Sequence, residues 1–320
     1  MFRHILIPLD GSGLAECSVS CAVAFARAFG ARVTLLRVLE KAQNTECLQP
    51  IDPLEWSMYK READTYLAEL GARFETEGIR AEFLLKEGHP AQRIIEAIQE
   101  KDIDLMVVSS HGRSGLSGWN AGSVFQKIIL RARISIMIVR AYHYCGEKDP
   151  SARFDFSRIL VPLDGSKRSE FALPPAATLA HSHNAELILA HVVNMPEMPR
   201  WTQLTQEDAE LVNRLVDRNR EEMGKHFETV LPRLPVEART LVETSDDAAL
   251  RLHELVQEQN ADLVVLSAHG YSGKSRWTFG SIAHTFIAYG TTPLLLVQDF
   301  PRDKIEPTEA EAAAAEKKGH

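Results

Sequence analysis

Short apolar runs alternate along the chain with longer stretches in which apolar and polar residues recur at helical spacing. The first run, HILIPLDGS (residues 4–12), is apolar until it ends in a polar turn. It is followed by ECSVSCAVAFARAFG (16–30), whose apolar residues recur every three or four positions, and then by the apolar run ARVTLLRV (31–38). These patterns predict a buried strand, an amphipathic helix and a second buried strand.

The same succession of patterns occurs twice in the chain. The run RILVPLDGS (158–166) matches HILIPLDGS at seven of nine positions, and AELILAHV (185–192) lies 154 positions after ARVTLLRV. In each half a long amphipathic stretch follows, at about 55–77 and 205–230, and then three further apolar runs separated by helical patterns. This repeat predicts two similar domains, as does a length of 320 residues at roughly 150 residues per domain.

The order of the predicted elements indicates the fold class. Strands that are apolar on both faces and alternate with helices are typical of a parallel sheet covered on both sides. We therefore expect an α/β fold in which each half is a doubly wound domain with a five-stranded parallel sheet. The expected domains are residues 1–145 and 155–300. Residues 301–320 have no apolar period and predict a flexible tail that is acidic and rich in alanine.

Composition and charge narrow the classes of function. Hydrophobic residues make up 45% of the chain and charged residues 25%, as in ordinary globular proteins. The net charge of -8 argues against a nucleic-acid-binding protein, which would carry a basic surface. No apolar run reaches the roughly 20 residues of a membrane span, and the N-terminus begins with a strand pattern instead of a signal peptide. We therefore expect a cytoplasmic protein that binds neither nucleic acid nor membranes.

The four cysteines are Cys17, Cys21, Cys47 and Cys145, all in the first half, so the two halves share no disulfide framework. Cys17 and Cys21 lie four positions apart on one face of a predicted helix, where they would suit a metal ion or a redox pair. We favour the simpler interpretation that they are small buried residues.

Polar residues follow the predicted strands at corresponding positions in the two halves. Asp10 and Asp164 follow the first strand of each half, and Val38 and Val192 close the second. In an open parallel sheet, ligands bind outside the carboxyl ends of the strands, at the point where the strand order reverses. These residues, together with the loop after the fourth strand, therefore predict one ligand cleft in each domain.

The loop after the fourth strand carries the most specific pattern in the sequence. It reads SSHGRSGLSGWNAGS (109–123) in the first half and SAHGYSGKSRWTFGS (267–281) in the second. Both copies share Ser-x-x-Gly, nine residues and then Gly-Ser. The second copy differs from a P-loop at one position, but Leu116 stands in the first copy where the second has Lys274. The shared spacing, and not the lysine, is therefore the signal.

This pattern suits the binding of a phosphate group. Glycines let backbone N–H groups approach phosphate oxygens closely. The Gly-Ser pair precedes a predicted helix, whose unpaired first N–H groups stabilise an anion. Arg113 in the first copy and Lys274 in the second would add positive charge. The aspartates would accept hydrogen bonds from ribose or from an adenine amine, and the valines would form an apolar wall for adenine.

Each of these residues also has an ordinary structural interpretation when it is taken singly. Ser123 and Ser281 would be helix N-caps, and Asp10 and Asp164 would be turn residues that cap the first helix of each half. His111 and His269, which each precede the loop glycine, would be bases or, as we favour, residues that orient the backbone. The recurrence of every element in the same order in both halves favours the binding site.

From Phe2 to about Gln298 the chain resembles a tandem universal stress protein, with two domains of that family in one polypeptide. Nucleotide-binding members of the family carry the motif G-2x-G-9x-G-[ST], and both loops match it except that a serine replaces the first glycine. Because serine is small, we expect it at most to weaken binding. The nucleotide-binding residues that the resemblance implies are Pro8, Asp10, Val38, Ser109, Gly112, Arg113, Gly122, Ser123, Val124, Pro162, Asp164, Val192, Ser267, Gly270, Lys274, Gly280, Ser281 and Ile282.

The resemblance also implies a fold, a ligand and a role. The fold is that of the adenine nucleotide alpha hydrolase-like proteins, with the two domains packed as a pseudo-dimer and a homodimer left open. The ligand is ATP, with or without magnesium, and the role is that of a nucleotide-responsive regulator in the stress response. We expect little or no hydrolysis, because the sequence offers no evident general base and no paired carboxylates for magnesium. A nucleotide-free interaction module and a slow ATPase or self-phosphorylating protein are the alternatives.

Overall fold

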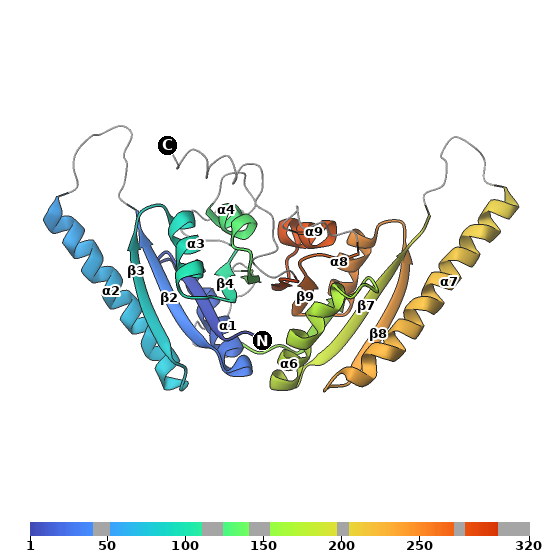
Figure 1. Ribbon diagram of the computed structural model, residues 1–320, viewed down its shortest axis with the longest axis horizontal. Helices are drawn as coiled ribbons and strands as arrows, with labels where there is room; N and C mark the ends of the chain where they lie inside the picture. Colours follow the sequence, from blue (N-terminus) through green and yellow to red (C-terminus); the bar gives the residue numbers. More distant parts are fainter. Residues whose placement is uncertain (41–51, 111–123, 141–153, 197–204, 272–278, 300–320) are drawn as a thin grey trace. The chain divides into compact units, whose positions relative to one another are not determined.

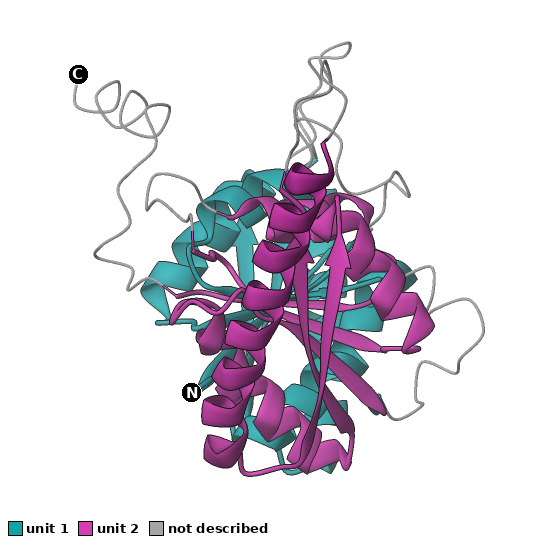
Figure 2. Cartoon of the chain, turned by 90° about the vertical axis from the view of Figure 1, so that its right-hand side faces the viewer, with its two compact units in different colours: residues 1–155 teal, residues 156–320 magenta. Residues whose placement is uncertain are grey.

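The computed structural model describes residues 1–40, 52–110, 124–140, 154–196, 205–271 and 279–299. The chain divides into two compact units, Met1–Asp155 and Phe156–His320 (Figure 2). Each unit contains one doubly wound α/β arrangement. The expected tail, residues 301–320, lies outside the described residues.

The described part of the first unit alternates strands with helices. Its elements are β1 (His4–Leu9), α1 (Gly13–Phe29), β2 (Arg32–Leu39), α2 (Pro53–Thr76), β3 (Ala81–Glu87), α3 (Pro90–Glu100), β4 (Leu105–Ser109), α4 (Val124–Arg131) and β5 (Ser135–Val139). The strands pair in parallel in the order β3-β2-β1-β4-β5 (Figure 1). The strand order therefore reverses between β1 and β4.

The second unit repeats this arrangement. Its described elements are β6 (Arg158–Pro162), η1 (Ser169–Ala172), α6 (Leu173–His183), β7 (Glu186–Asn194), α7 (Gln206–Val230), η2 (Leu231–Arg233), β8 (Ala238–Ser245), α8 (Ala248–Glu258), β9 (Leu263–Ser267), α9 (Ser281–Tyr289) and β10 (Leu294–Val297). The strands again pair in parallel, in the order β8-β7-β6-β9-β10. The predicted fold class, two doubly wound domains with five-stranded parallel sheets, is confirmed.

Helices cover both faces of the second sheet. Helices α6 and α7 pack against β6, β7 and β8, whereas α8 packs against β7 and β8 and contacts α9. Figure 1 shows α7 and α8 on opposite faces of the sheet. Because parallel crossovers are right-handed, a connection that moves outward along the sheet and one that returns place their helices on opposite faces. The central strands are consequently buried on both sides: every residue of β9 is buried, whereas the edge strand β8 is mostly half-buried.

The ends of the helices follow from local sequence. Helix α7 begins with a capping box in which Thr205 and Asp208 each accept a hydrogen bond from the other residue's backbone N–H. Helix α6 begins directly after the 3₁₀ turn η1, and its first turn carries the adjacent prolines 174 and 175. Proline is tolerated there because the first N–H groups of a helix have no intrahelical partner.

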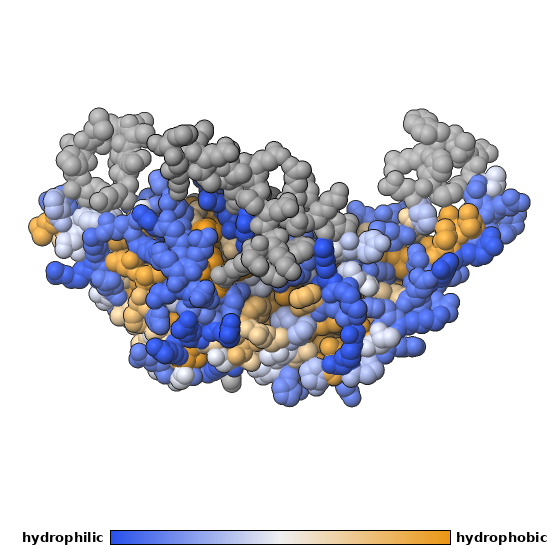
Figure 3. Space-filling model, in the orientation of Figure 1, coloured by the Kyte–Doolittle hydropathy of each residue, from blue (hydrophilic) through white to orange (hydrophobic). Residues whose placement is uncertain are grey.

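The surface of the described residues is mostly polar. Figure 3 shows hydrophilic residues over most of the face in view, with smaller apolar patches between them. Helix α7 illustrates the separation, since Met223, Phe227 and Val230 are buried while most of its other residues are half-buried or exposed. Among the described residues, none of the helices combines the length and the apolar character that a membrane crossing requires.

Candidate functional site

A cleft of about 760 Å³ opens at the carboxyl ends of the strands in the second unit. It lies where the strand order reverses, between β6 and β9. Its walls are the ends of these two strands, the end of β7, one face of α7 and the start of α9. This is the place at which an open parallel sheet binds ligands, because the flanking connections leave the sheet in opposite directions.

The structure brings the predicted residues of the second half together. All those that lie in the described part of the chain line this one cleft: Pro162, Asp164, Val192, Ser267, Gly270, Gly280, Ser281 and Ile282. Lys274 lies outside the described residues. The lining residues come from β6, β7, the loop after β9 and the start of α9. These segments are far apart in the chain and lie close together only in the folded domain.

The predicted residues of the first half fall into two groups. Gly112, Arg113, Gly122 and Ser123 lie outside the described residues, as does His111. The others are placed on the corresponding elements: Pro8 in β1, Asp10 directly after β1, Val38 in β2, Ser109 at the end of β4 and Val124 at the start of α4.

Asp10 in the first unit shows the turn geometry that its position predicts. Its Oδ1 accepts hydrogen bonds from the Ser12 backbone N–H at 2.9 Å and from the Ser12 hydroxyl at 2.6 Å. Ser12 in turn caps α1, because its Oγ accepts from the Ala15 N–H at 3.2 Å. The helix cap is therefore Ser12, and Asp10 supports it from the preceding turn.

Asp164 in the second unit joins the end of β6 to the loop after β9. Its Oδ1 accepts from the Ser166 N–H at 2.9 Å, and its Oδ2 accepts from the Tyr271 N–H at 2.6 Å. Partial burial alone would raise the pKa of Asp164, but hydrogen bonds from Ser166, from the Tyr271 backbone and from Ser169 lower it below its usual value. The carboxylate is therefore a charged acceptor at the edge of the cleft.

Gly270 makes the approach of Asp164 to the loop sterically allowed. A Cβ atom at Gly270 would collide with Asp164 Oδ2. Gly270 does not have a positive φ, so close approach, and not backbone conformation, is the reason for glycine here. Gly270 occupies the second glycine position of the nucleotide-binding motif.

The Gly-Ser pair sets the start of α9. Gly280 is the N-cap of the helix, and its N–H donates to the Ala268 carbonyl oxygen at 2.8 Å. Ser281 is the first helical residue and is exposed, and no side chain caps the helix. The single-residue interpretation of Ser281 as an N-cap is therefore wrong, because glycine already occupies that position. The first N–H groups of α9 have no partner within the helix, and they lie at the end of the helix that borders the cleft.

His269 connects the start of the loop to the end of β10. It is buried, and its Nδ1 lies 2.7 Å from Asp299 Oδ1, with Asp299 also buried. This contact supports the interpretation that His269 orients the loop backbone. The first half has Ala141 where the second has Asp299, 158 positions later, so sequence comparison between the halves gave no signal for this pair.

Helix α7 contributes one wall of the cleft that the sequence analysis missed. The lining residues on this helix are Asn219, Glu222, Met223 and His226. Their spacing of three, four and seven positions places them on one helix face, but the face is mostly polar, and such a face is also typical of a helix surface exposed to solvent. The sequence alone did not indicate that this face lies over the carboxyl ends of the strands.

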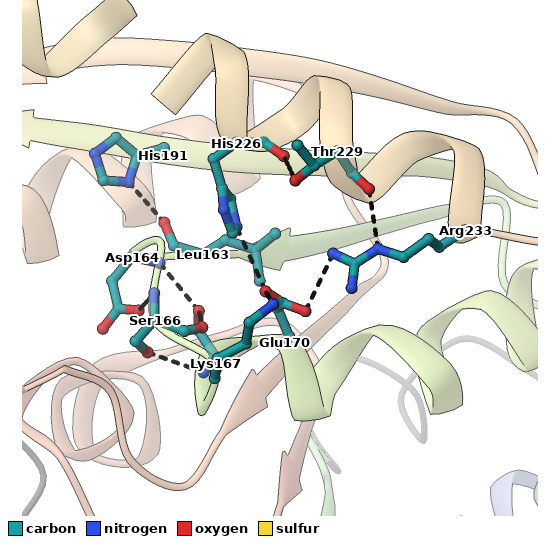
Figure 4. A network of polar contacts seen from close by, with 10 residues as sticks. Leu163, Asp164, Ser166, Lys167, Glu170, His191, His226, Thr229 and Arg233 are labelled. Carbon is teal, nitrogen blue, oxygen red and sulfur yellow. Dashed lines mark hydrogen bonds and ion pairs between the residues drawn. The ribbon is translucent and has the colours of Figure 1, made fainter. Parts of the chain in front are cut away.

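His191 was also missed, although it precedes the predicted Val192. Its Nδ1 lies 2.7 Å from the Leu163 carbonyl oxygen (Figure 4). Burial lowers the pKa of His191, so the ring is neutral, and because a carbonyl can only accept, the proton lies on Nδ1. Nε2 is then a hydrogen-bond acceptor on the wall of the cleft.

Glu170, in the segment after β6, lies close to basic side chains of that segment, of α7 and of η2. Glu170 lies 2.9 Å from Lys167 Nζ, 3.3 Å from Arg233 Nη2 and 3.9 Å from His226 Nε2 (Figure 4). Glu170 is mostly buried, with 13% of its side chain exposed, whereas Lys167 and Arg233 are exposed. Of these contacts, the one at 3.9 Å reaches a residue that lines the cleft, His226.

Metal chemistry has no support in the described residues. Within those ranges no group of three or more His, Cys, Asp and Glu side chains is placed to hold a metal ion. Cys21 is fully buried and burial raises the pKa of its thiol well above the usual value, which opposes the thiolate that a metal ion or a redox pair would need.

These features define a class of protein: a pair of doubly wound α/β domains with a ligand cleft at the point where strand order reverses. The model of the universal stress protein family matches residues 1–140 and again residues 155–298. The chain therefore belongs to the universal stress protein family and carries two of its domains in tandem. This membership supports a role in the stress response.

The chain is similar to several proteins that are named universal stress proteins. The universal stress protein YxiE of Bacillus subtilis (strain 168) is 30% identical over 149 residues, which are 44% of this chain and 100% of YxiE. The crystal structure of a universal stress protein from Archaeoglobus fulgidus DSM 4304 covers 93% of this chain and 98% of its own, with a TM-score of 0.59 and 18% identity. A universal stress protein solved in complex with cAMP covers 44% of this chain and 98% of its own, with 23% identity and a TM-score of 0.35.

Proposed function

We propose that the cleft of the second unit binds an adenine nucleotide, with ATP as the expected ligand, and that the protein is a nucleotide-responsive regulator in the stress response. The first unit is expected to offer a corresponding site. The observation that carries this proposal is the convergence of the nucleotide motif, Asp164 and Val192 on one cleft. Its volume of about 760 Å³ lies within the range of small-molecule sites, roughly 300–1,000 Å³.

The charges in the cleft suggest how a nucleotide would be oriented. The phosphates fit at the glycine loop and the start of α9, where backbone N–H groups and the helix dipole stabilise negative charge. The Asp164 carboxylate would repel a phosphate but accepts hydrogen bonds from ribose hydroxyl groups. The base would then pack against the wall formed by Val192. His191 Nε2 adds a hydrogen-bond acceptor on the same strand.

We propose that hydrolysis is slow or absent. Phosphoryl transfer depends on groups that position a water molecule and on cations that neutralise the developing charge. His269 precedes the loop glycine, but its bond to Asp299 suits a role in orienting the backbone. The regulator is therefore preferred to a slow ATPase. The pseudo-dimer of the two domains and any homodimer stay predictions of the family resemblance.

The test is to identify and count the nucleotides that the protein carries. Gently purified protein is unfolded, and the released small molecules are identified by mass spectrometry and counted per chain. Two adenine nucleotides per chain would support both loops, and one would support a single occupied unit. If nothing is released and millimolar ATP does not raise the melting temperature, the nucleotide-free interaction module replaces this proposal.

The variant Gly280→Ala tests whether the second unit binds the nucleotide. A Cβ atom there would lie 3.7 Å from Ala268 O, Gly270 N and His269 Cα, which is ordinary contact, and the φ of −71° suits alanine. The variant should therefore fold, while its methyl group covers the Gly270 N–H that a phosphate would approach. We expect it to lose the nucleotide of this unit. The matched control is Gly224→Ala on α7, where an added Cβ meets nothing within 4 Å, and it should bind as the wild type does.

A further inference from the structure

The side chain of Ser267 is an unexplained polar group in the wall of the cleft. Ser267 is the last residue of β9, is 8% exposed and lines the cleft. Within the described part of the chain, its Oγ has no hydrogen-bond partner. Only one other cleft-lining residue among those described has such a buried polar atom, His226, and its Nε2 lies 3.9 Å from Glu170. Ser267 is therefore the clearest case of an unsatisfied group in this wall.

A neighbouring serine shows how a hydroxyl in this wall is normally satisfied. Ser169, which is also buried and lines the cleft, donates from its Oγ to the Ser166 carbonyl oxygen at 2.8 Å and accepts from the Asp164 N–H at 3.4 Å. Leaving a buried hydroxyl without such partners costs free energy, and buried polar groups in native proteins are nearly always paired. A bound ligand would supply the missing partner for Ser267.

The position of Ser267 indicates which part of a ligand it would meet. Strands β6 and β9 run in parallel with Leu160 opposite Val264, so their carboxyl ends, with Asp164 and Ser267, reach the same edge of the sheet. Ser267 is also the first residue of the loop that continues to Gly270. It lines the same cleft as the acceptor suited to ribose and the N–H groups suited to phosphate. Its hydroxyl can take different staggered positions by rotation about the Cα–Cβ bond.

We propose that the Ser267 hydroxyl is a ligand-binding group that hydrogen-bonds the ribose–phosphate part of the nucleotide. The inference rests on the proposed function and extends it. A hydroxyl both donates and accepts, so it serves a phosphate oxygen or a ribose hydroxyl equally well. Serine in place of the first motif glycine then adds a contact, whereas the family resemblance by itself leads to the opposite expectation of weaker binding.

Three variants test this inference. Ser267→Ala removes only the hydroxyl, and Ser267→Gly restores the residue of the family motif. Ser18→Ala is the matched control, because Ser18 is also buried but its Oγ donates to the Ala15 carbonyl oxygen at 2.6 Å within α1, a helix that does not line the cleft. Binding of ATP and of adenosine is measured by titration calorimetry fitted for up to two sites per chain, and the melting temperature is measured without ligand.

The inference predicts opposite effects on affinity and on stability. Ser267→Ala and Ser267→Gly should each weaken ATP binding at one site by about three- to ten-fold, the effect of losing one hydrogen bond. The ligand-free melting temperature of Ser267→Ala should not fall, because no partner is lost. Ser18→Ala should lower the melting temperature and leave both affinities unchanged. An equal loss of affinity for adenosine assigns the contact to ribose, and a loss for ATP alone assigns it to phosphate.

The outcomes separate this inference from the proposed function. If the wild-type protein binds ATP and both Ser267 variants bind it as tightly, or if Ser267→Gly binds it more tightly, the inference is overturned and the proposed function stands. If the wild-type protein binds neither ATP nor adenosine, the proposed function fails and takes the inference with it.

Discussion

Replacing Gly270 by alanine is expected to destabilise the second unit through its contact with Asp164. The added methyl group would collide with Asp164 Oδ2, so the carboxylate must swing away from the loop. It then loses the 2.6 Å hydrogen bond from the Tyr271 N–H. A hydrogen bond to a charged group contributes about 1.5–3 kcal/mol, and the exposure of Asp164 to the cleft favours the lower end of this range.

We therefore expect Gly270→Ala to lower the free energy of unfolding by about 1.5 kcal/mol, which corresponds to about 3–6 °C in the melting temperature of a domain of this size. Urea unfolding followed by circular dichroism, together with calorimetry, measures both quantities. The matched substitution Gly224→Ala, inside α7 and free of contacts within 4 Å, should have the opposite sign and stabilise by about 0.5–1 kcal/mol.

A double-mutant cycle with Asp164→Ala tests the cause. In a chain without the carboxylate, Gly270→Ala has nothing to collide with and should cost close to nothing, so the two substitutions are expected to couple by about 1.5 kcal/mol. The reasoning would be refuted if Gly270→Ala left stability unchanged, or if it cost as much in the Asp164→Ala background as in the wild type.

Two further predictions concern single hydrogen-bonded groups. The bonds that lower the pKa of Asp164 contribute stability that is fully present above the unfolded-state pKa of about 3.9 and is lost as the pH falls through the lower folded-state value. Asp164→Asn should flatten this acid loss in unfolding titrations between acidic and neutral pH, and an unchanged slope would contradict the assignment. Thr205→Ala removes half of the capping box of α7 and should cost about 1 kcal/mol in urea unfolding. Thr229→Ala, in the last turn of the same helix, should change stability by less than about 0.5 kcal/mol, and equal effects of the two substitutions would count against the capping argument.

The fold could be predicted largely because its signals are local. The alternation of buried strands and amphipathic helices depends on residues a few positions apart, and the repeat made every element appear twice. The helix expected at 205–230 is α7, Gln206–Val230, and the one expected at 55–77 is α2, Pro53–Thr76. The position of the site also followed from a general rule, since parallel strands bring their carboxyl ends to one edge.

The interior of the cleft could not be predicted in the same way, because its contacts join residues far apart in the chain. The bond between Asp164 and Tyr271 spans 107 positions, and that between His191 and Leu163 depends on the neighbouring places of β6 and β7 in the sheet. The face of α7 that lines the cleft is polar, so its spacing alone did not distinguish a binding wall from a solvated surface. Local sequence also suggested Ser281, taken singly, as the cap of α9, whereas Gly280 holds that position.

The sequence by itself therefore determined the elements, their order, their duplication and the spacing of the loop, since these depend on short-range periodicity and on the conformations that single residues allow. Only the tertiary structure decided which groups face one another. The order and register of the strands place the Asp164 carboxylate on the Gly270–Tyr271 backbone and leave the Ser267 hydroxyl without a partner among the described residues. Such pairings join residues that are far apart in the chain, so they depend on the packing of the complete domain. A pattern of neighbouring residues does not predict them.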